Sequence, residues 1–359
     1  MATQAAAEEV LFFIPDLGGF TKFIAETEIQ HSQHIVKELL EILVDANTLG
    51  MKVSEIEGDA VLFYRTGAPP PLEKIVQQTR KMYLDFHTYL KKFEYARICQ
   101  CGACAGASGI TLKMVAHAGS TGTMRVKDHL KFIGKDIIIA HRLLKNSVPS
   151  PEHLLVTGAT LSKLRVTDGE LTAFSAGADA YDNLGTIDYR FKSLDGYLGE
   201  VRVDPPAPEG LSNPRKMTQI TRRIDAPIEQ VYQRLIDLPG RMNWMAGVSR
   251  IEMSDDQANY IGKTHRCVRG EEGFPVKTTD VRISESTMEI WETDLKKTSS
   301  CRYLLTRVPG GKADLAIELF VRDNPVIRLI FRVLMEKKLK SFFEQSIANL
   351  GALCEKANR

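Results

Sequence analysis

The chain has 359 residues, of which 43% are hydrophobic and 26% charged, and its formal net charge is +2. This balance is typical of a globular protein and excludes the marked basic excess of a nucleic-acid-binding surface. The most apolar segment near the end, PVIRLIFRVLM, carries Arg328 and Arg332 and falls short of the roughly 20 apolar residues of a membrane span. We therefore expect no nucleic-acid partner and no transmembrane segment.

The N-terminal stretch MATQAAAEEV lacks the basic and apolar regions of a secretory signal, so we expect a cytoplasmic protein with reduced thiols. Cys99, Cys101 and Cys104 form a C-x-C-x-x-C pattern. A structural zinc site needs a fourth ligand, for which His117 is the near candidate. A glycine-bounded loop with reduced or redox-sensing thiols is the interpretation we favour.

A proline-rich segment, DPPAPEGLSNP at residues 204–214, divides the chain. Four prolines in so short a stretch prevent a helix or a central strand and indicate a semi-rigid linker. We predict a first domain at residues 8–203, a linker at 204–216 and a second domain at 217–357.

The first half alternates strand and helix patterns. VLFFIPD at residues 10–16 is an apolar run in which Pro15 marks a strand end. The remaining patterns, in chain order, are helical spacing from 20 to about 49, two strands around Gly58 and Asp59 within 54–64, a helix at 72–93, a strand at 110–119, a helix within 131–147 and a strand at 154–158. This order predicts an α+β sheet with helices packed on one face.

The second half begins with an alternating strand at 217–227 and a helix at 227–238, continues with several strands and closes with one long helix from 325 to about 356. We expect its apolar positions to form one buried stripe: Ile327, Ile330, Phe331, Leu334, Leu339, Phe342, Phe343, Ile347, Leu350 and Leu353. Its basic residues at 328, 332, 337, 338 and 340 are then expected on the solvated face, with membrane contact as the alternative.

Two aspartates are placed for metal binding. Asp16 ends the first strand, and Asp59 lies at the hairpin turn. Two carboxylates at neighbouring strand ends, beside a helix N-terminus, suit Mg²⁺ together with a polyphosphate. The carboxylates would bind the ion, and the free N–H groups of the helix would bind the anionic oxygens of the polyphosphate. The residues expected to offer them are Leu17, Gly18, Gly19, Phe20 and Thr21. In the alternative interpretation, Asp16 only caps the helix and Asp59 only turns the hairpin.

VLFFIPDLGGFTKF together with EIEGDAVLFY resembles the class III nucleotidyl cyclase catalytic domain, which carries an F-x-D-I-x-G-F-T element followed by a Gly–Asp hairpin. LKMVAHAGSTG and LKFIGKDIIIAHRLL are similar to two later elements of that family. The resemblance spans about residues 10–200 and implies a ferredoxin-like fold. It also implies that Asp16 and Asp59 bind Mg²⁺ or Mn²⁺ for cyclisation of a purine nucleoside triphosphate to a 3′,5′-cyclic nucleotide.

The resemblance also shows departures. The family's transition-state pair is an Asn and, four residues later, an Arg; Arg142 stands at the second position, but Ile138 stands at the first. Arg190 or Lys192 could take the part of the family's triphosphate lysine. Loss of one such donor typically costs about 10²–10³ in rate, so a weak enzyme and an inactive binder both remain open.

The base-reading positions of the family correspond to Glu55 and Lys131. A carboxylate accepting from guanine N1–H and N2–H, with an ammonium donating to O6, matches GTP. Adenine can be read if the two side chains exchange places, and a plain surface ion pair is the remaining alternative. Glu57 has no role in the resemblance and is expected to be solvated.

The family's active site takes its aspartates and its arginine from two protomers. We expect that the helix carrying Arg142 does not reach the hairpin of its own chain, so that residues 10–200 form a homodimer with two equivalent sites.

RRIDAPIEQVYQRLIDLPGRMNWM, the run of strands and the closing helix resemble the helix-grip superfamily of START-like and polyketide-cyclase-like proteins. This resemblance implies a curved sheet around the helix and a hydrophobic small molecule as ligand. The predicted function is metal-dependent nucleotide binding, with cyclisation if active, coupled to a sensor domain. The alternatives are a catalytically degenerate regulator and a carrier of lipids or other hydrophobic ligands.

Overall fold

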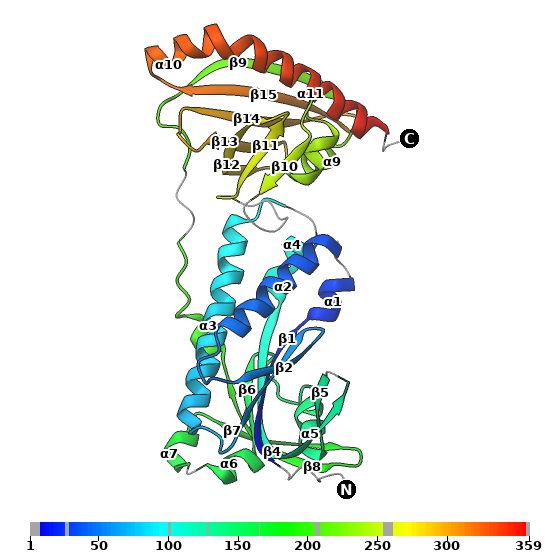
Figure 1. Ribbon diagram of the computed structural model, residues 1–359, viewed down its shortest axis with the longest axis vertical. Helices are drawn as coiled ribbons and strands as arrows, with labels where there is room; N and C mark the ends of the chain where they lie inside the picture. Colours follow the sequence, from blue (N-terminus) through cyan, green and yellow to red (C-terminus); the bar gives the residue numbers. More distant parts are fainter. Residues whose placement is uncertain are drawn as a thin grey trace. The chain divides into compact units, whose positions relative to one another are not determined.

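The computed structural model describes residues 8–25, 29–99, 102–127, 129–164, 166–204, 209–253 and 261–356. The chain divides into two compact units, Met1–Phe93 with Cys101–Val203, and Glu94–Gln100 with Asp204–Arg359 (Figure 1).

The first unit is built around a mixed sheet. Its elements are β1 (Glu8–Gly18), α1 (Phe20–Ala25), α2 (Ile29–Asp45), β2 (Lys52–Glu57), β3 (Ala60–Thr66), α3 (Leu72–Ala96), α4 (Gly102–Gly106), a 3₁₀ turn η1 (Ala107–Gly109), β4 (Thr111–Val126), β5 (His129–Ile133), α5 (Lys135–Arg142), β6 (His153–Thr157), α6 (Gly158–Lys163), α7 (Asp168–Leu171), β7 (Ser175–Tyr181), β8 (Gly185–Ser193) and α8 (Asp195–Leu198). The strand order is β2-β3-β1-β4-β6-β8-β7, with β5 paired to β4.

The four strands at one end of this sheet define the fold. They follow the order β4-β1-β3-β2, and each neighbouring pair is antiparallel. Helices connect β1 to β2 and β3 to β4. This is the βαββαβ arrangement of a ferredoxin-like domain, so the fold class predicted for the first half is confirmed.

Helices cover both faces of the sheet, whereas the sequence pattern predicted one covered face. On one face, Phe12 and Ile14 of β1 pack against Ile137 of α5. Leu11 and Phe13 point the other way and are equally buried, on the side where α2 contacts β3 (Figure 1). A strand buried on both faces has no alternating pattern, and this explains the continuous apolar run of β1.

The second unit is a seven-stranded antiparallel sheet with a long helix. Its elements are β9 (Pro214–Ile224), α9 (Ile228–Ile236), a 3₁₀ turn η2 (Pro239–Asn243), β10 (Arg250–Met253), β11 (Thr264–Arg269), β12 (Glu272–Ile283), β13 (Thr287–Asp294), β14 (Ser299–Val308), β15 (Lys312–Arg322), α10 (Pro325–Ile330), a π-helical turn η3 (Phe331–Met335) and α11 (Glu336–Lys356). The order is β10-β11-β12-β13-β14-β15-β9.

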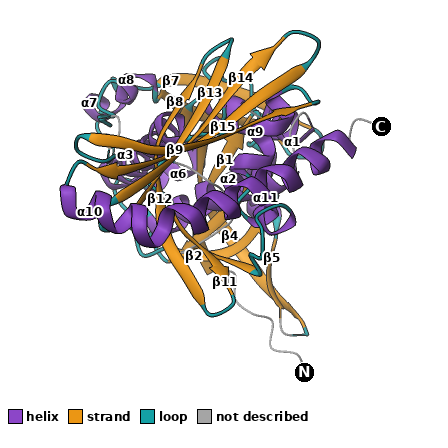
Figure 2. Cartoon of the chain, turned by 90° about the horizontal axis from the view of Figure 1, so that it is seen from above, coloured by secondary structure: helices purple, strands orange, loops and turns teal. Residues whose placement is uncertain are grey.

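The closing helix packs on the second sheet, as a helix-grip fold requires (Figure 2). Phe343 of α11 contacts the ring of Tyr303 with centroids 6.5 Å apart, and Ser346 Oγ accepts a hydrogen bond from the backbone N–H of Ala246 at 3.0 Å. Tyr232 Oη donates to the carbonyl of Ile98 at 2.6 Å, which holds part of segment 94–100 in this unit. The predicted helix-grip class is therefore confirmed.

One feature of the closing helix differs from the prediction. Ile330 and Leu334, expected in the buried stripe, are 46% and 63% exposed, whereas Phe331 between them is 3% exposed. The π-helical turn changes the residue spacing here, so the stripe of α11 does not continue into α10. Among the described residues, no helix combines the length and hydrophobicity needed to cross a membrane.

Candidate functional site

Asp16 lies near the end of β1, on the sheet face that α5 covers. Its cross-strand neighbours are Ala60 of β3 and Lys113 of β4. The alternate residues before it, Phe12 and Ile14, belong to the core cluster under α5. Asp16 is therefore a carboxylate at the edge of an apolar core, with 9% of its surface exposed.

Asp59 lies next to Asp16 through the hairpin. Gly58 has φ +63°, the left-handed conformation that a tight turn requires and glycine allows. The carbonyl of Asp59 accepts a hydrogen bond from the Leu17 N–H at 3.1 Å, which ties the turn to the residue after Asp16. The structure thus brings the two predicted metal ligands to the same corner of the sheet.

The two carboxylates of this corner are partly buried, and burial raises the pKa of each. Burial raises the pKa of Asp16, and the neighbouring Asp59 carboxylate raises it further, whereas Lys113 lowers it. Burial also raises the pKa of Asp59, again against the effect of Lys113. Burial is the largest cause at both residues, so the ionised forms of both carboxylates are disfavoured, and a nearby positive charge relieves that cost.

Lys113 is a member of this corner that the sequence analysis did not single out. Its Nζ lies 3.1 Å from Asp16 Oδ2 and donates to the carbonyl of Leu144, just beyond α5, at 2.7 Å. The signal was present in the strand pattern, because Lys113 is a charged residue between two apolar positions. Its partner could be known only once the β1–β4 register was fixed.

The predicted phosphate-binding segment follows directly. Gly19 adopts φ +79° at the turn into α1, and its carbonyl accepts from Phe23 N–H at 3.0 Å. Leu17 is buried and its N–H already bonds Asp59, so Leu17 has no amide to offer. Gly18, Phe20 and Thr21 lie beside it, between β1 and the first turn of α1.

Glu55 and Lys131, the predicted base-reading pair, contact each other within one chain. Lys131 Nζ lies 3.3 Å from Glu55 Oε2, with the lysine side chain 55% exposed and the glutamate 31%. Lys131 lies in β5, a strand where the sequence pattern predicted helix. This contact agrees with the alternative interpretation, in which Glu55 and Lys131 form a surface ion pair. The same contact also places a hydrogen-bond acceptor beside a hydrogen-bond donor.

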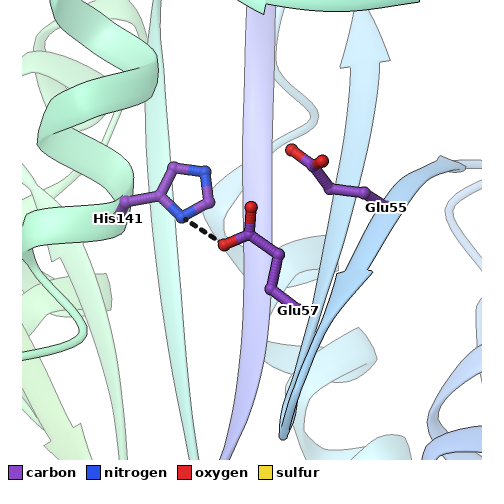
Figure 3. Close-up of side chains that lie close together, drawn as sticks. All are labelled: Glu55, Glu57 and His141. Carbon is purple, nitrogen blue, oxygen red and sulfur yellow. Dashed lines mark ion pairs between the residues drawn. The ribbon is translucent and has the colours of Figure 1, made fainter. Parts of the chain in front are cut away.

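Glu57 and His141 form a contact that the sequence analysis missed. His141 Nδ1 lies 3.5 Å from Glu57 Oε2, and Figure 3 shows the imidazole of α5 and the carboxylate of β2 pointing toward each other. One oxygen each of Glu55 and Glu57 and one nitrogen of His141 lie within 4.8 Å of one another. This mixed N/O set suits a divalent transition metal, although Lys131 already neutralises part of its charge.

The His141 contact corrects one geometric expectation. From the sequence, the helix carrying Arg142 is not expected to reach the hairpin of its own chain. His141 of that helix does reach Glu57 of the hairpin, because α5 lies flat on the sheet through Ile137 and Ala140. Arg142, the next residue, is exposed.

Two further candidates are placed as follows. Ile138 is 50% exposed on α5, four residues before Arg142.

Among the proposed zinc ligands, Cys101 lies outside the described residues, and Cys99 and Cys104 are buried. The ring nitrogens of His117 already face hydrogen-bonding partners, Thr157 Oγ1 at 2.9 Å and Asp136 Oδ1 at 3.1 Å, so His117 is not free to be the fourth ligand.

The second unit holds a buried charged cluster. Arg241 is fully buried and binds Glu292 through two nitrogens at 2.6 and 3.1 Å. Its guanidinium also donates to the carbonyl of Leu235, at 2.9 Å from Nη2, and contacts His265 Nε2 at 3.1 Å. Burial lowers the pKa of His265 to about 4. The N–H donors of Arg241 all bond to groups within the protein, which is typical of a structural network.

Two family models match the chain. Residues 36–153 match a family described as "Protein of unknown function (DUF2652)". Residues 215–355 match the family "Polyketide cyclase / dehydrase and lipid transport", whose match covers the second sheet and its helix.

One curated relative is "Uncharacterized protein Rv2561/Rv2562" of Mycobacterium tuberculosis (strain ATCC 25618 / H37Rv), 33% identical over 120 residues. The alignment covers 33% of this chain and 56% of the relative, so the chain spans little more than half the length of that protein.

Similar solved structures include cyclase domains. The guanylyl cyclase Cya2 is 13% identical with a TM-score of 0.38, covering 54% of this chain and 98% of that one. The catalytic core of a rhodopsin-guanylyl cyclase with converted specificity, in complex with ATPαS, is 18% identical with a TM-score of 0.36, covering 52% and 96%. The guanylate cyclase domain of RhGC from Catenaria anguillulae in complex with GTP is 18% identical with a TM-score of 0.34, covering 51% and 95%. The fold assignment rests on strand order and not on these alignments.

Proposed function

We propose that the first unit binds a purine nucleoside triphosphate together with Mg²⁺ or Mn²⁺, and that it acts in signalling with slow cyclisation at most. The observation that carries this proposal is the corner formed by Asp16 and Asp59, where burial raises both pKa values. Hard divalent cations prefer carboxylate oxygens, so this donor set fits the ion. A bound ion supplies positive charge to the triphosphate.

The residues of this chain have separate roles in the proposal. Asp16 and Asp59 hold the ion, and Lys113, 3.1 Å from Asp16, provides the counter-charge when no ion is bound. The backbone from Gly18 to Thr21 faces the phosphates. When an ion binds Asp16, it must displace the Lys113 ammonium from that carboxylate. The negative charge of the nucleotide then stabilises both the ion and the displaced ammonium.

Base recognition is proposed for Glu55 and Lys131. Their contact at 3.3 Å opens when guanine inserts, since guanine supplies two donors to the carboxylate and one acceptor to the ammonium. A base that leaves one of these groups unpaired loses affinity. We therefore expect GTP to bind more tightly than ATP, and equal affinities would contradict this assignment.

Slow turnover is expected because of one residue on α5, Ile138. Ile138 occupies the position at which class III nucleotidyl cyclases, which the first unit resembles, have an Asn. The Ile138 side chain neither donates nor accepts a hydrogen bond. One such donor is worth about 10²–10³ in rate. The Ile138→Asn variant should therefore produce more 3′,5′-cyclic nucleotide than the unsubstituted protein. If neither forms product while both bind nucleotide, the first unit is a regulator without turnover.

The binding test is calorimetry with Mn²⁺ and GTP. Asp59→Asn should weaken binding at least about tenfold, because an amide is a poor ligand for a hard cation. Asp182→Asn, in the exposed turn between β7 and β8, is the matched control and should bind as the unsubstituted protein does. Unchanged affinity in Asp59→Asn would remove the metal proposal.

A homodimer through the first unit remains part of the proposal. Successive residues on a helix point about 100° apart, so Arg142 diverges from His141, which faces its own hairpin. Arg142 is then available to the aspartates of a second copy. Mixing Asp59→Asn with Arg142→Ala should restore one intact site per mixed dimer, measured as Mn²⁺-dependent GTP binding or turnover. A strictly monomeric protein with Mn²⁺ and GTP present would contradict it.

For the second unit we propose a hydrophobic small-molecule ligand, supported by the match of residues 215–355 to a family whose description includes lipid transport. Native mass spectrometry of the intact chain, before and after extraction with organic solvent, tests this directly. Loss of a bound mass on extraction supports the carrier or sensor role, and a bare chain that takes up no added fatty acid contradicts it.

A further inference from the structure

The segment from α10 through η3 exposes large apolar side chains. Their exposed fractions run from 46% to 70%, and the residues are Val326, Leu329, Ile330, Val333 and Leu334. Folded proteins rarely leave contiguous apolar surface of this kind uncovered unless it contacts a partner. Asn324 caps this segment with its side chain, accepting from the N–H groups of Val326 and Ile327, so the exposed residues lie on a formed helix.

The exposed residues share one side of the helix. Within α10, Val326, Leu329 and Ile330 follow the spacing i, i+3 and i+4 of a single helix face. Val333 and Leu334 follow four residues after Leu329 and Ile330, in the π-helical turn η3. Phe331 packs inward, with 3% exposure, and anchors the segment on its own unit. The segment is labelled α10 in Figures 1 and 2, where it forms one end of the long closing helix.

Basic residues accompany the apolar face. Arg328 and Arg332 lie within 325–335, a stretch without Asp or Glu, and Lys337, Lys338 and Lys340 follow on the first turns of α11. Arg328 has a partial partner in Asp323 at 3.3 Å. Even with Asp323 and Glu336 counted, the segment 323–340 carries five basic residues and two acidic ones.

We propose that this face docks on the surface of an anionic lipid bilayer. An amphipathic helix with Lys and Arg beside an apolar face lies in the plane of the membrane interface, with the apolar side chains below the headgroups and the cations at the phosphates. The exposed stretch is too short to span a bilayer, so the contact is peripheral.

Charge decides between a bilayer and a second copy of the chain. A two-fold contact through this face would bring two sets of basic residues together, and like charges repel. An anionic surface instead attracts each cation, in a manner that salt weakens. The charge pattern therefore complements anionic lipid.

The test is vesicle flotation with the full chain, using phosphatidylcholine vesicles with and without phosphatidylglycerol. The unsubstituted protein should float with the phosphatidylglycerol vesicles, and added salt should weaken this. Val333→Glu should reduce the bound fraction at least tenfold. Phe274→Glu is the matched control, because Phe274 on β12 is also 70% exposed but lies outside the segment, and it should bind normally.

The charge contribution is tested separately. Arg332→Gln should weaken binding to the anionic vesicles about fivefold, with little effect on any residual binding to phosphatidylcholine alone. Circular dichroism should show all three variants folded, as expected for changes at exposed positions.

Three results would overturn the proposal. One is no flotation of the unsubstituted protein with either vesicle. Another is equal flotation of Val333→Glu and the unsubstituted protein. The third is a dimer by light scattering that Val333→Glu dissociates, because this would show that a second copy covers the face.

Discussion

Two charged clusters, one in each unit, contain similar residue types in opposite settings. Glu55, Glu57 and His141 lie at the surface, with Glu57 54% exposed and its imidazole contact at 3.5 Å. Arg241, Glu292 and His265 are buried, and the Arg241–Glu292 contact is 2.6 Å.

Burial and hydrogen bonding separate the accessible cluster from the structural one. In the buried cluster, the Nε, Nη1 and Nη2 groups of Arg241 donate to Glu292, His265 and the Leu235 carbonyl, so these donors are already bonded within the protein. In the surface cluster, the Glu57 side chain is 54% exposed and its contact with His141 is longer, at 3.5 Å, so these side chains are accessible to a ligand. Removing a partner should therefore affect stability in the buried cluster and ligand binding at the surface one.

Breaking the buried Arg241–Glu292 pair should cost the most stability. Arg241→Met should destabilise the second unit by about 3–5 kcal/mol, because it leaves Glu292 charged, buried and without its main partner. Trp fluorescence during denaturant unfolding measures this selectively, since the chain's two tryptophans, Trp244 and Trp291, both belong to the second unit.

The control for this change breaks an exposed ion pair in the same unit. Lys312 Nζ lies 2.9 Å from Asp225 Oδ1, with both side chains well exposed. Lys312→Met should change stability by less than about 1 kcal/mol. Equal losses in Arg241→Met and Lys312→Met would mean that burial does not separate the two kinds of charge contact.

The next effect is a pH dependence in the same cluster. Burial lowers the pKa of His265 to about 4, so the folded unit keeps this imidazole neutral while the unfolded chain protonates it near pH 6.5. The unfolded state binds more protons below that pH, and stability is lost as the pH falls. Between pH 6.5 and 5 the loss should be about 2 kcal/mol.

Glu292 does not titrate in the folded unit between pH 6.5 and 5. The Arg241 guanidinium counters the effect of burial and holds the pKa of the Glu292 carboxyl below its usual value. Unfolding of the second unit, followed by Trp fluorescence at a series of pH values, measures the slope. His265→Gln should flatten it. A slope that persists in His265→Gln would assign the pH dependence to other groups.

Substitutions in the surface cluster should change stability least. Glu57→Gln and His141→Ala should each change unfolding stability by less than about 1 kcal/mol, because the pair is exposed and screened by solvent. Thermal unfolding of the first unit followed by far-ultraviolet circular dichroism checks this. A loss as large as that of Arg241→Met would show that the hairpin and α5 depend on this contact for their packing.

Much of the framework could be predicted from the sequence because it depends on local patterns. The Gly58–Asp59 turn, the strand ending near Asp16 and the helix after Pro325 follow from residue-level preferences for backbone conformation and from periodicity. Apolar periodicity also identified most strands of the second sheet. The sequence predicted which carboxylates lie at strand ends but could not predict what lies beside them.

The order of elements and the position of two aspartates at neighbouring strand ends can be predicted from the amino-acid sequence alone. The packed fold is needed to show that Lys113 faces Asp16, that His141 reaches Glu57, and that segment 94–100 belongs with the second unit. The π-helical turn also decided that Leu334 is exposed while Phe331 is buried. These contacts depend on strand register and helix rotation, which the packing of distant residues sets and which no local stretch of sequence encodes.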